Sequence, residues 1–152
     1  MRTRLAIISV CLTLLAMAFC AGCTRTLDAD LVNAAYVGDV DRIKLLIQRG
    51  ANLDALAVDG WNALSMASRE GHLEAANVLV RSGAKIDAPE GGGNTPLFWA
   101  VFYDRRDVVK FLISKGADVN KKAKDGETPL HVALRLGHND AAELLREAGA
   151  KY

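Results

Sequence analysis

Three histidines, His72, His131 and His138, are the side chains of this 152-residue chain with the widest chemical range. An imidazole can act as a general base or bind a metal ion near neutral pH. No two of the three have the spacing of metal ligands on one helix face, and no cysteine follows Cys23. We therefore expect no metal site and no cofactor, and a structural role for each histidine.

Nucleophilic catalysis and phosphate binding are also poorly supported. Gly91-Gly92-Gly93 lacks the Lys-Ser/Thr pair that completes a phosphate-binding P-loop. The serines of the chain occur in no Gly-x-Ser-x-Gly elbow. A set of acids recurs along the chain, and we interpret these residues as helix caps rather than as a catalytic pair: Asp41, Glu74, Asp107 and Asp140. The sequence predicts no enzyme.

A fixed period of 33 residues organises these side chains. The Gly-Ala pair recurs at this interval, beginning at Gly50, Gly83, Gly116 and Gly149. A leucine keeps the same step at Leu31, Leu64, Leu97 and Leu130. A fixed period of this length predicts a stack of similar units, each of which buries its apolar face on its neighbours.

The last unit shows the elements that such a repeat should contain. Thr128 is a good N-cap and Pro129 suits the first position of a helix, which Gly137 should end. A second helix should open at Asn139 and end before Gly149. Glycines at matching places between the units predict an extended arm with a tight tip: Gly60, Gly93 and Gly126.

The run Thr128-Pro129-Leu130-His131-Val132-Ala133 resembles the ankyrin signature, and Thr95-Pro96-Leu97-Phe98-Trp99-Ala100 matches it except at the histidine. Asn62-Ala63-Leu64-Ser65-Met66-Ala67 is a looser copy. The resemblance implies an all-α solenoid of four helix–turn–helix units with β-hairpin-like connecting arms. The domain would cover residues 31–152, with repeats at about 27–60, 61–93, 94–126 and 127–152.

The resemblance also implies where a partner protein would bind, because ankyrin proteins typically use the arm tips and the inward face of the first helices. Transferred to this sequence, that surface includes Tyr36, Leu56, Val58, Trp61, Arg69, Phe102, Tyr103, Lys122, Lys124 and Arg135. We expect the large aromatics among them to be available for contact, since the core does not need them at these places, although Trp61 and Phe102 packing locally on the next arm is the alternative. Trp99 replaces a core aliphatic residue, so we expect it to be structural.

The first residues have the pattern of an export signal. Arg2 and Arg4 precede an uncharged stretch from Leu5 to Phe19. The Ala21-Gly22-Cys23 run resembles the lipobox of bacterial lipoproteins, although Cys20 stands where leucine is usual. The resemblance implies a signal peptide over residues 1–22, a lipidated Cys23 and a tether over residues 23–30. Thr24 then implies an outer-membrane lipoprotein facing the periplasm. A retained membrane helix and ordinary secretion are the alternatives.

The charge balance limits the kind of partner. Without Arg2 and Arg4, the 19 Lys and Arg residues become 17, against 18 Asp and Glu residues. A nearly neutral domain does not point to nucleic acid. We predict a monomeric, membrane-tethered adaptor of the bacterial envelope that binds another protein without catalysis. The alternatives are an immunity protein that inhibits a periplasmic toxin or effector enzyme, and a support factor for an exported enzyme.

Overall fold

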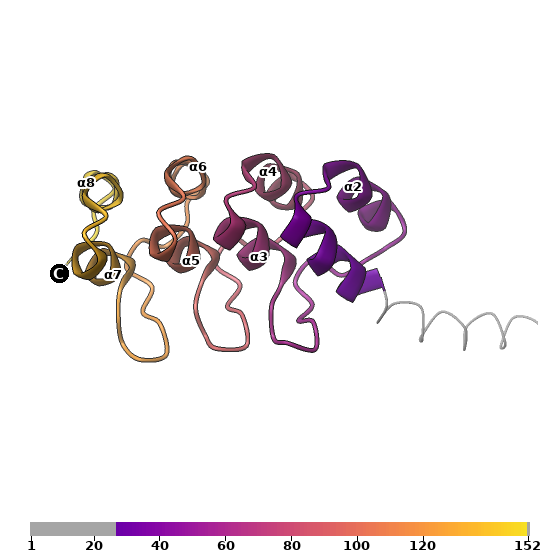
Figure 1. Cartoon of the computed structure of the whole chain (residues 1–152), viewed down its shortest axis with the longest axis horizontal. Coiled ribbons are helices and arrows are strands. Elements are labelled where there is room, and N and C mark those ends of the chain that lie inside the picture. Colours follow the sequence, from indigo (N-terminus) through magenta and orange to yellow (C-terminus); the bar gives the residue numbers. More distant parts are fainter. Residues whose placement is uncertain (1–26, 152) are drawn as a thin grey trace, which may run out of the picture.

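The computed structural model describes residues 27–151 and arranges them as helix pairs stacked along one axis (Figure 1). A first helix covers residues 27–37, and seven more follow it. These are α2 (Val40–Gln48), α3 (Ala63–Glu70), α4 (Leu73–Arg81), α5 (Pro96–Phe102), α6 (Arg106–Ser114), α7 (Pro129–Leu136) and α8 (Asn139–Glu147). The predicted all-α solenoid of four units is confirmed.

The helices form two rows. In Figure 1 the first helix, α3, α5 and α7 make an inner row, and α2, α4, α6 and α8 make an outer row on the side away from the arms. Within the inner row α3 packs on α5 and α5 on α7. In the outer row, α4 contacts both α2 and α6, and α6 contacts α8.

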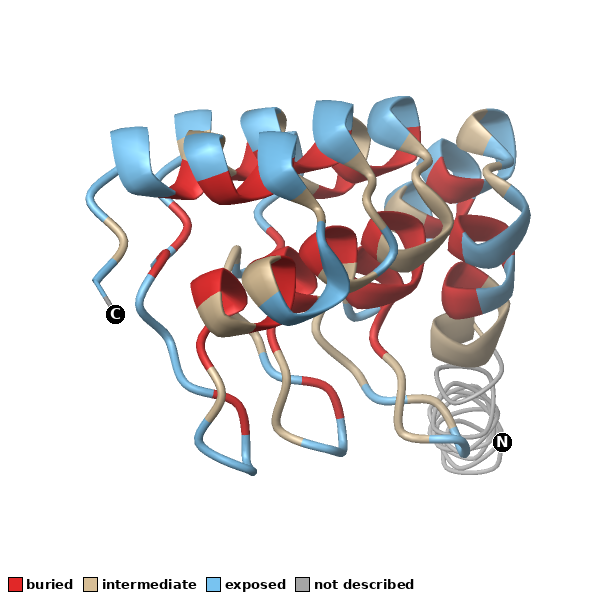
Figure 2. Cartoon of the chain, turned by 60° about the vertical axis from the view of Figure 1, so that its left-hand side comes forward, coloured by how far each residue is buried: buried red, intermediate tan, exposed pale blue. Residues whose placement is uncertain are grey.

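The core lies between the two rows, where buried residues concentrate (Figure 2). Its centre is the periodic leucine column of Leu31, Leu64, Leu97 and Leu130, each at most 2% exposed. Helices of seven to nine residues would be marginal in isolation. Burial against neighbouring units therefore supplies most of their stability.

Helix ends follow the predicted capping pattern. Asn62, Thr95 and Thr128 precede α3, α5 and α7, and each accepts a hydrogen bond from the backbone N–H three residues on. In α4, α6 and α8 the N-cap side chain makes no such bond. The periodic acids Glu74, Asp107 and Asp140, interpreted from the sequence as helix caps, lie in the first turn of these helices, after the N-cap residue. There their negative charge faces the positive end of the helix dipole.

Each arm is a tight turn. In the first arm Ala57 N–H donates to Trp61 C=O and Gly60 N–H donates to Ala57 C=O, both at 2.8 Å. The same two bonds recur around Glu90 and around Ala123. Two bonds are too few for a ladder, and no strand is assigned between residues 27 and 151. The β-hairpin-like detail of the prediction is thus a closed turn.

A polar side chain at the base of each arm keeps neighbouring units in register. Asp54 Oδ1 accepts a hydrogen bond from Lys85 N–H at 2.9 Å, and Asp87 Oδ1 accepts one from Asp118 N–H at 3.1 Å. Asn120 Oδ1 repeats the contact with Lys151 N–H at 2.7 Å. The spacing of 31 residues is the same in all three, so the base of each arm is tied to the backbone that follows the next helix pair.

The predicted signal peptide (residues 1–22) and Cys23 lie outside the described residues. The first helix already includes residues 27–30, the last part of the predicted tether. Over residues 27–151, every helix is too short or too polar to cross a bilayer.

Candidate functional site

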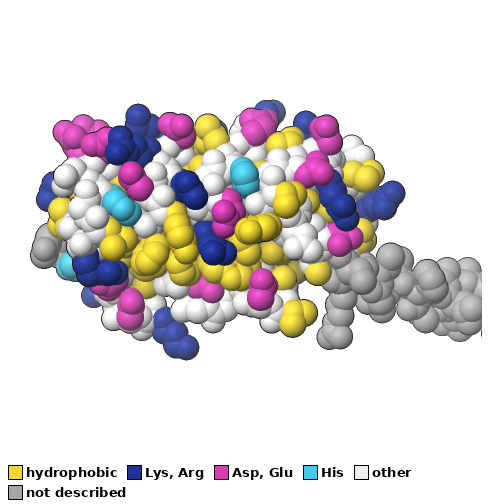
Figure 3. All heavy atoms as spheres, viewed as in Figure 1, with side chains coloured by type: hydrophobic (Ala, Val, Ile, Leu, Met, Phe, Trp, Pro, Cys, Tyr) yellow, Lys and Arg dark blue, Asp and Glu magenta, His cyan; other side chains and the backbone are white. Residues whose placement is uncertain are grey.

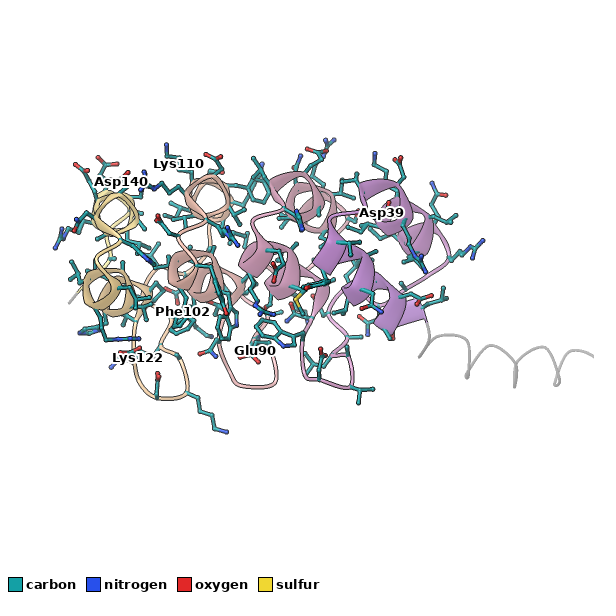
Figure 4. The ribbon with its side chains drawn as sticks, viewed as in Figure 1. Asp39, Glu90, Phe102, Lys110, Lys122 and Asp140 are labelled. Carbon is teal, nitrogen blue, oxygen red and sulfur yellow. The ribbon has the colours of Figure 1, made fainter. Side chains whose placement is uncertain are left out.

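One position of the repeat lies in the last turn of each inner helix and projects toward the arms. Its occupants are Tyr36, Arg69, Phe102 and Arg135, at the constant spacing of 33 residues. The side of the molecule that these side chains share with the arms is called the arm face below. Figure 4 shows Phe102 of α5 and Glu90 of the arm on this side of the inner row.

An aromatic cluster occupies the middle of the arm face and consists of Trp61, Phe98, Trp99, Phe102 and Tyr103. Trp99 is its hub, with ring centroids 4.9 Å from Trp61, 5.7 Å from Phe102 and 6.2 Å from Tyr103. Aromatic rings attract one another at these separations. The expected structural role of Trp99 agrees with this geometry.

The cluster corrects one expectation about the aromatic residues. Trp61 and Phe102 were expected at places that the core does not need, but both are partly buried and pack against it. Tyr36 and Tyr103 are the more exposed pair, at 50% and 39%. Trp61 and Phe102 therefore contribute to stability as well as to the surface.

Arg69 of α3 lies against this cluster. Its guanidinium carbon is 5.2 Å from the ring centroid of Trp61 and 5.4 Å from that of Tyr103, within the range of cation–π attraction. Its Nε is 3.5 Å from Glu70 Oε1. Hydrogen bonding with the Tyr103 side chain raises the pKa of Arg69 above its ordinary value. A raised pKa contributes its stability in full at any pH below the ordinary pKa of arginine, so this guanidinium adds no pH dependence near neutrality.

A groove between the first and second repeats begins beside Arg69 and has a volume of about 570 Å³. Its walls are mainly apolar and include Val32, Tyr36, Val58, Trp61 and Met66. We call this feature the Arg69 groove. Sequence reasoning identified Tyr36, Val58, Trp61 and Arg69, but it missed Val32 and Met66, which belong to the buried core.

Exposed apolar side chains collect around the Arg69 groove. Val58 at the first arm tip is fully exposed, and Leu56 on the same arm is 50% exposed. In Figure 3 hydrophobic side chains form a band along the inner helices, above the arms. Contiguous exposed apolar surface often marks a site of association.

The three cationic residues of the predicted surface other than Arg69 lie elsewhere. Lys122 and Lys124 are exposed on the last arm, where Figure 4 labels Lys122. Arg135 forms two hydrogen bonds with Glu127, from Nε to Oε1 at 3.0 Å and from Nη2 to Oε2 at 2.8 Å. The structure thus divides the predicted site into an apolar region near the first arm and a charged region near the last.

The histidines have the geometry of structural residues. His72 Nε2 is 3.0 Å from Tyr36 C=O and His138 Nδ1 is 2.9 Å from Val101 C=O, in each case across a repeat boundary. His131 Nδ1 is 2.9 Å from Thr128 Oγ1, at the start of the same helix. The part of the chain that the structure describes contains no cluster of three or more His, Cys, Asp or Glu side chains able to hold a metal ion.

Comparison with known families agrees with the repeat architecture. A model of ankyrin repeats in three copies matches residues 31–123 and, in a second overlapping match, residues 90–152. No curated protein matches the chain significantly in sequence.

Proposed function

Because the chain belongs to the ankyrin-repeat family, whose repeats imply a protein–protein interaction module, we propose that it binds one partner protein through its arm face and catalyses no reaction. The single observation that carries this proposal is the exposure of large apolar side chains there. Tyr36, Leu56, Val58 and Tyr103 are all more than a third exposed on one side of the stack. Burying them would favour association at about 25 cal/mol per Å².

The proposal also places the module at a membrane. Cys23, with the small pair Ala21-Gly22 before it, would be lipidated and would hold the repeats at the bacterial envelope, facing the periplasm. A lipid anchor contributes about 0.8 kcal/mol for each buried methylene, so two or more chains give stable attachment. This part of the proposal depends on the sequence pattern alone.

The direct test captures partners from solubilised membranes with the full chain. We expect Trp61→Ala and Phe102→Ala each to weaken capture by about 2 kcal/mol, the scale of an interface hot spot. The matched control is Leu45→Ala, since Leu45 is an exposed apolar side chain of the outer row. Because Trp61 and Phe102 also support the aromatic cluster, thermal unfolding must show that both variants remain folded. Equal capture by all variants would exclude the arm face.

Capture also distinguishes an adaptor from an immunity protein. A partner with hydrolase activity that the bound chain inhibits would favour the immunity function. A partner whose activity does not change would favour the adaptor.

A further inference from the structure

Two arginines occupy the same position of the repeat, two periods apart, but have different partners. Arg135 is held by Glu127 in a two-bond, fork-to-carboxylate contact. In the second repeat, two periods before Glu127, the equivalent position is occupied by Trp61. The second repeat therefore keeps the arginine and replaces its carboxylate with an indole ring.

Trp61 substitutes for only part of what Glu127 supplies. With Tyr103 it orders the guanidinium of Arg69 through ring contacts at 5.2 and 5.4 Å, and the Tyr103 side chain adds a hydrogen bond but no carboxylate. A ring accepts no in-plane hydrogen bonds from the N–H fork, which matches a carboxylate in two-bond geometry. Glu70 approaches Arg69 through one atom pair, Nε and Oε1, at 3.5 Å. The Arg69 Nη1 contact is with the sulfur of Met66, a weak acceptor, at 3.9 Å.

The surroundings define what else a ligand must contain. Arg69 lies at the edge of an apolar groove lined by Val32, Tyr36 and Val58. The acid in this lining is Asp59, whose Oδ1 accepts a hydrogen bond from Trp61 N–H at 3.4 Å. A cation fixed by aromatic rings beside an apolar hollow is complementary to a carboxylate joined to a large apolar group.

We propose that the Arg69 groove binds a segment of the partner protein in which an aspartate or glutamate stands next to a large apolar residue. The carboxylate takes the place on Arg69 that Glu127 has on Arg135, and the apolar side chain fills the groove against Tyr36 and Val58. This inference rests on the proposed function and adds the chemistry of the partner to it.

The leader of the chain itself does not have this chemistry. Residues 1–26 contain arginines but no aspartate or glutamate. That segment can offer apolar side chains to the groove, but it cannot supply a carboxylate side chain to Arg69. Charge complementarity therefore favours a separate acidic polypeptide over the leader.

The test uses the purified full chain in a nonionic detergent and a phage-displayed library of random peptides. We expect the enriched peptides to share an acidic residue beside Leu, Phe or Trp. One enriched peptide and its analogue with Gln or Asn in place of the acid are then titrated against the wild type and Arg69→Met. Loss of the acid should weaken binding to the wild type by about 10- to 100-fold, the range for hydrogen bonds to charged groups, and should change binding to Arg69→Met little.

Two controls make the result specific. Arg81→Met removes an exposed arginine at the end of α4, in the outer row, and should leave peptide affinity unchanged. Methionine at position 69 keeps an unbranched apolar chain between Trp61 and Tyr103, and unfolding curves check that the fold persists.

Several results would overturn the inference. The library could give no enriched peptide, or it could enrich peptides without an acid. Replacing the acid of the peptide by Gln or Asn could also lower its affinity equally for the wild type and for Arg69→Met. If acid-free apolar peptides bind and Val58→Ser abolishes their binding, the partner chemistry is wrong but the arm face remains the binding surface. Self-association of the wild type that Arg69→Met removes would assign the groove to a second copy of this chain and would also contradict the proposal.

Discussion

Arg105 donates a hydrogen bond from Nε to the backbone carbonyl of Arg69 at 3.0 Å. It stands where the second and fourth repeats have His72 and His138, which contact carbonyls of the preceding repeat at 3.0 and 2.9 Å. An arginine and two histidines thus make the same connection between units. Short inner helices leave carbonyl groups unpaired at their ends, and these side chains satisfy them.

Removing this connection should cost measurable stability. We expect Arg105→Ala to lower the free energy of unfolding by about 1 kcal/mol, because one hydrogen bond across a repeat boundary is lost. Arg105→His restores the side chain found in the other repeats and should lose less. Urea denaturation measures both, and Arg81→Ala on the exposed side of α4 should stay within about 0.5 kcal/mol of the wild type. A loss for Arg105→Ala no larger than that of Arg81→Ala would show that the bond contributes nothing.

Two glycines allow backbone strain to be separated from steric contact. Gly71 and Gly137 end α3 and α7 with φ of +86° and +74°. A Cβ at Gly71 would lie 2.8 Å from Arg105 Cδ, whereas a Cβ at Gly137 meets nothing within 4 Å. Gly137→Ala should therefore cost about 1–2 kcal/mol of stability from strain alone, and Gly71→Ala should cost more.

The same contact predicts coupling between Gly71 and Arg105. In an Arg105→Ala background the excess cost of Gly71→Ala over Gly137→Ala should disappear, since the atom that it meets is gone. Persistence of the excess in that background would contradict this steric explanation. The double-mutant cycle is measured by urea denaturation.

The leucine column is predicted to be the main source of stability. Leu97 is fully buried between the rows, so Leu97→Ala should cost about 2–5 kcal/mol through lost burial and a residual cavity. Leu136 is 37% exposed, and Leu136→Ala should cost less than about 1 kcal/mol. Calorimetric unfolding compares the two variants. Similar losses would mean that the stack does not depend on this column.

Lipidation is tested by the mass of the mature N-terminus. We expect the chain to begin at Cys23, to carry a diacylglyceryl group on sulfur and to fractionate with membranes. Cys23→Ala should remain uncleaved, because the lipobox cysteine is the modified residue. An unmodified Cys23, or an intact Met1 on the wild type, would contradict the lipid anchor.

The fold was largely predictable because the sequence of each repeat contains the residues that begin and end its helices. Thr128 and Pro129 indicated the start of α7, and Gly137 indicated its end. The period of 33 residues repeats this pattern along the chain. Asp104 is an exception, with φ of 51° where Gly71 and Gly137 stand in other repeats. Aligning the repeats would have revealed this position, whereas residue type alone did not.

The site was less predictable, because its geometry depends on which side chains contact one another, both within a repeat and between repeats. Spacing placed Arg69 and Arg135 at equivalent positions, but it did not reveal that Glu127 pairs with one while Trp61 and Tyr103 cover the other. Likewise, the partial burial of Trp61 follows from its contact with Trp99, which belongs to the next repeat. A per-residue pattern carries no information about such cross-repeat pairs.

Binding through the arm face is tested most directly by site-specific photo-crosslinking in cells. A benzophenone side chain is introduced at Val58, fully exposed at the first arm tip, or at Leu45, 44% exposed on the outer row. Both positions are apolar and accessible, so they differ mainly in the face that they report. Binding through the arm face predicts a discrete protein adduct from position 58 and none from position 45. Adducts of equal yield from both positions, or an adduct from position 45 alone, would contradict it.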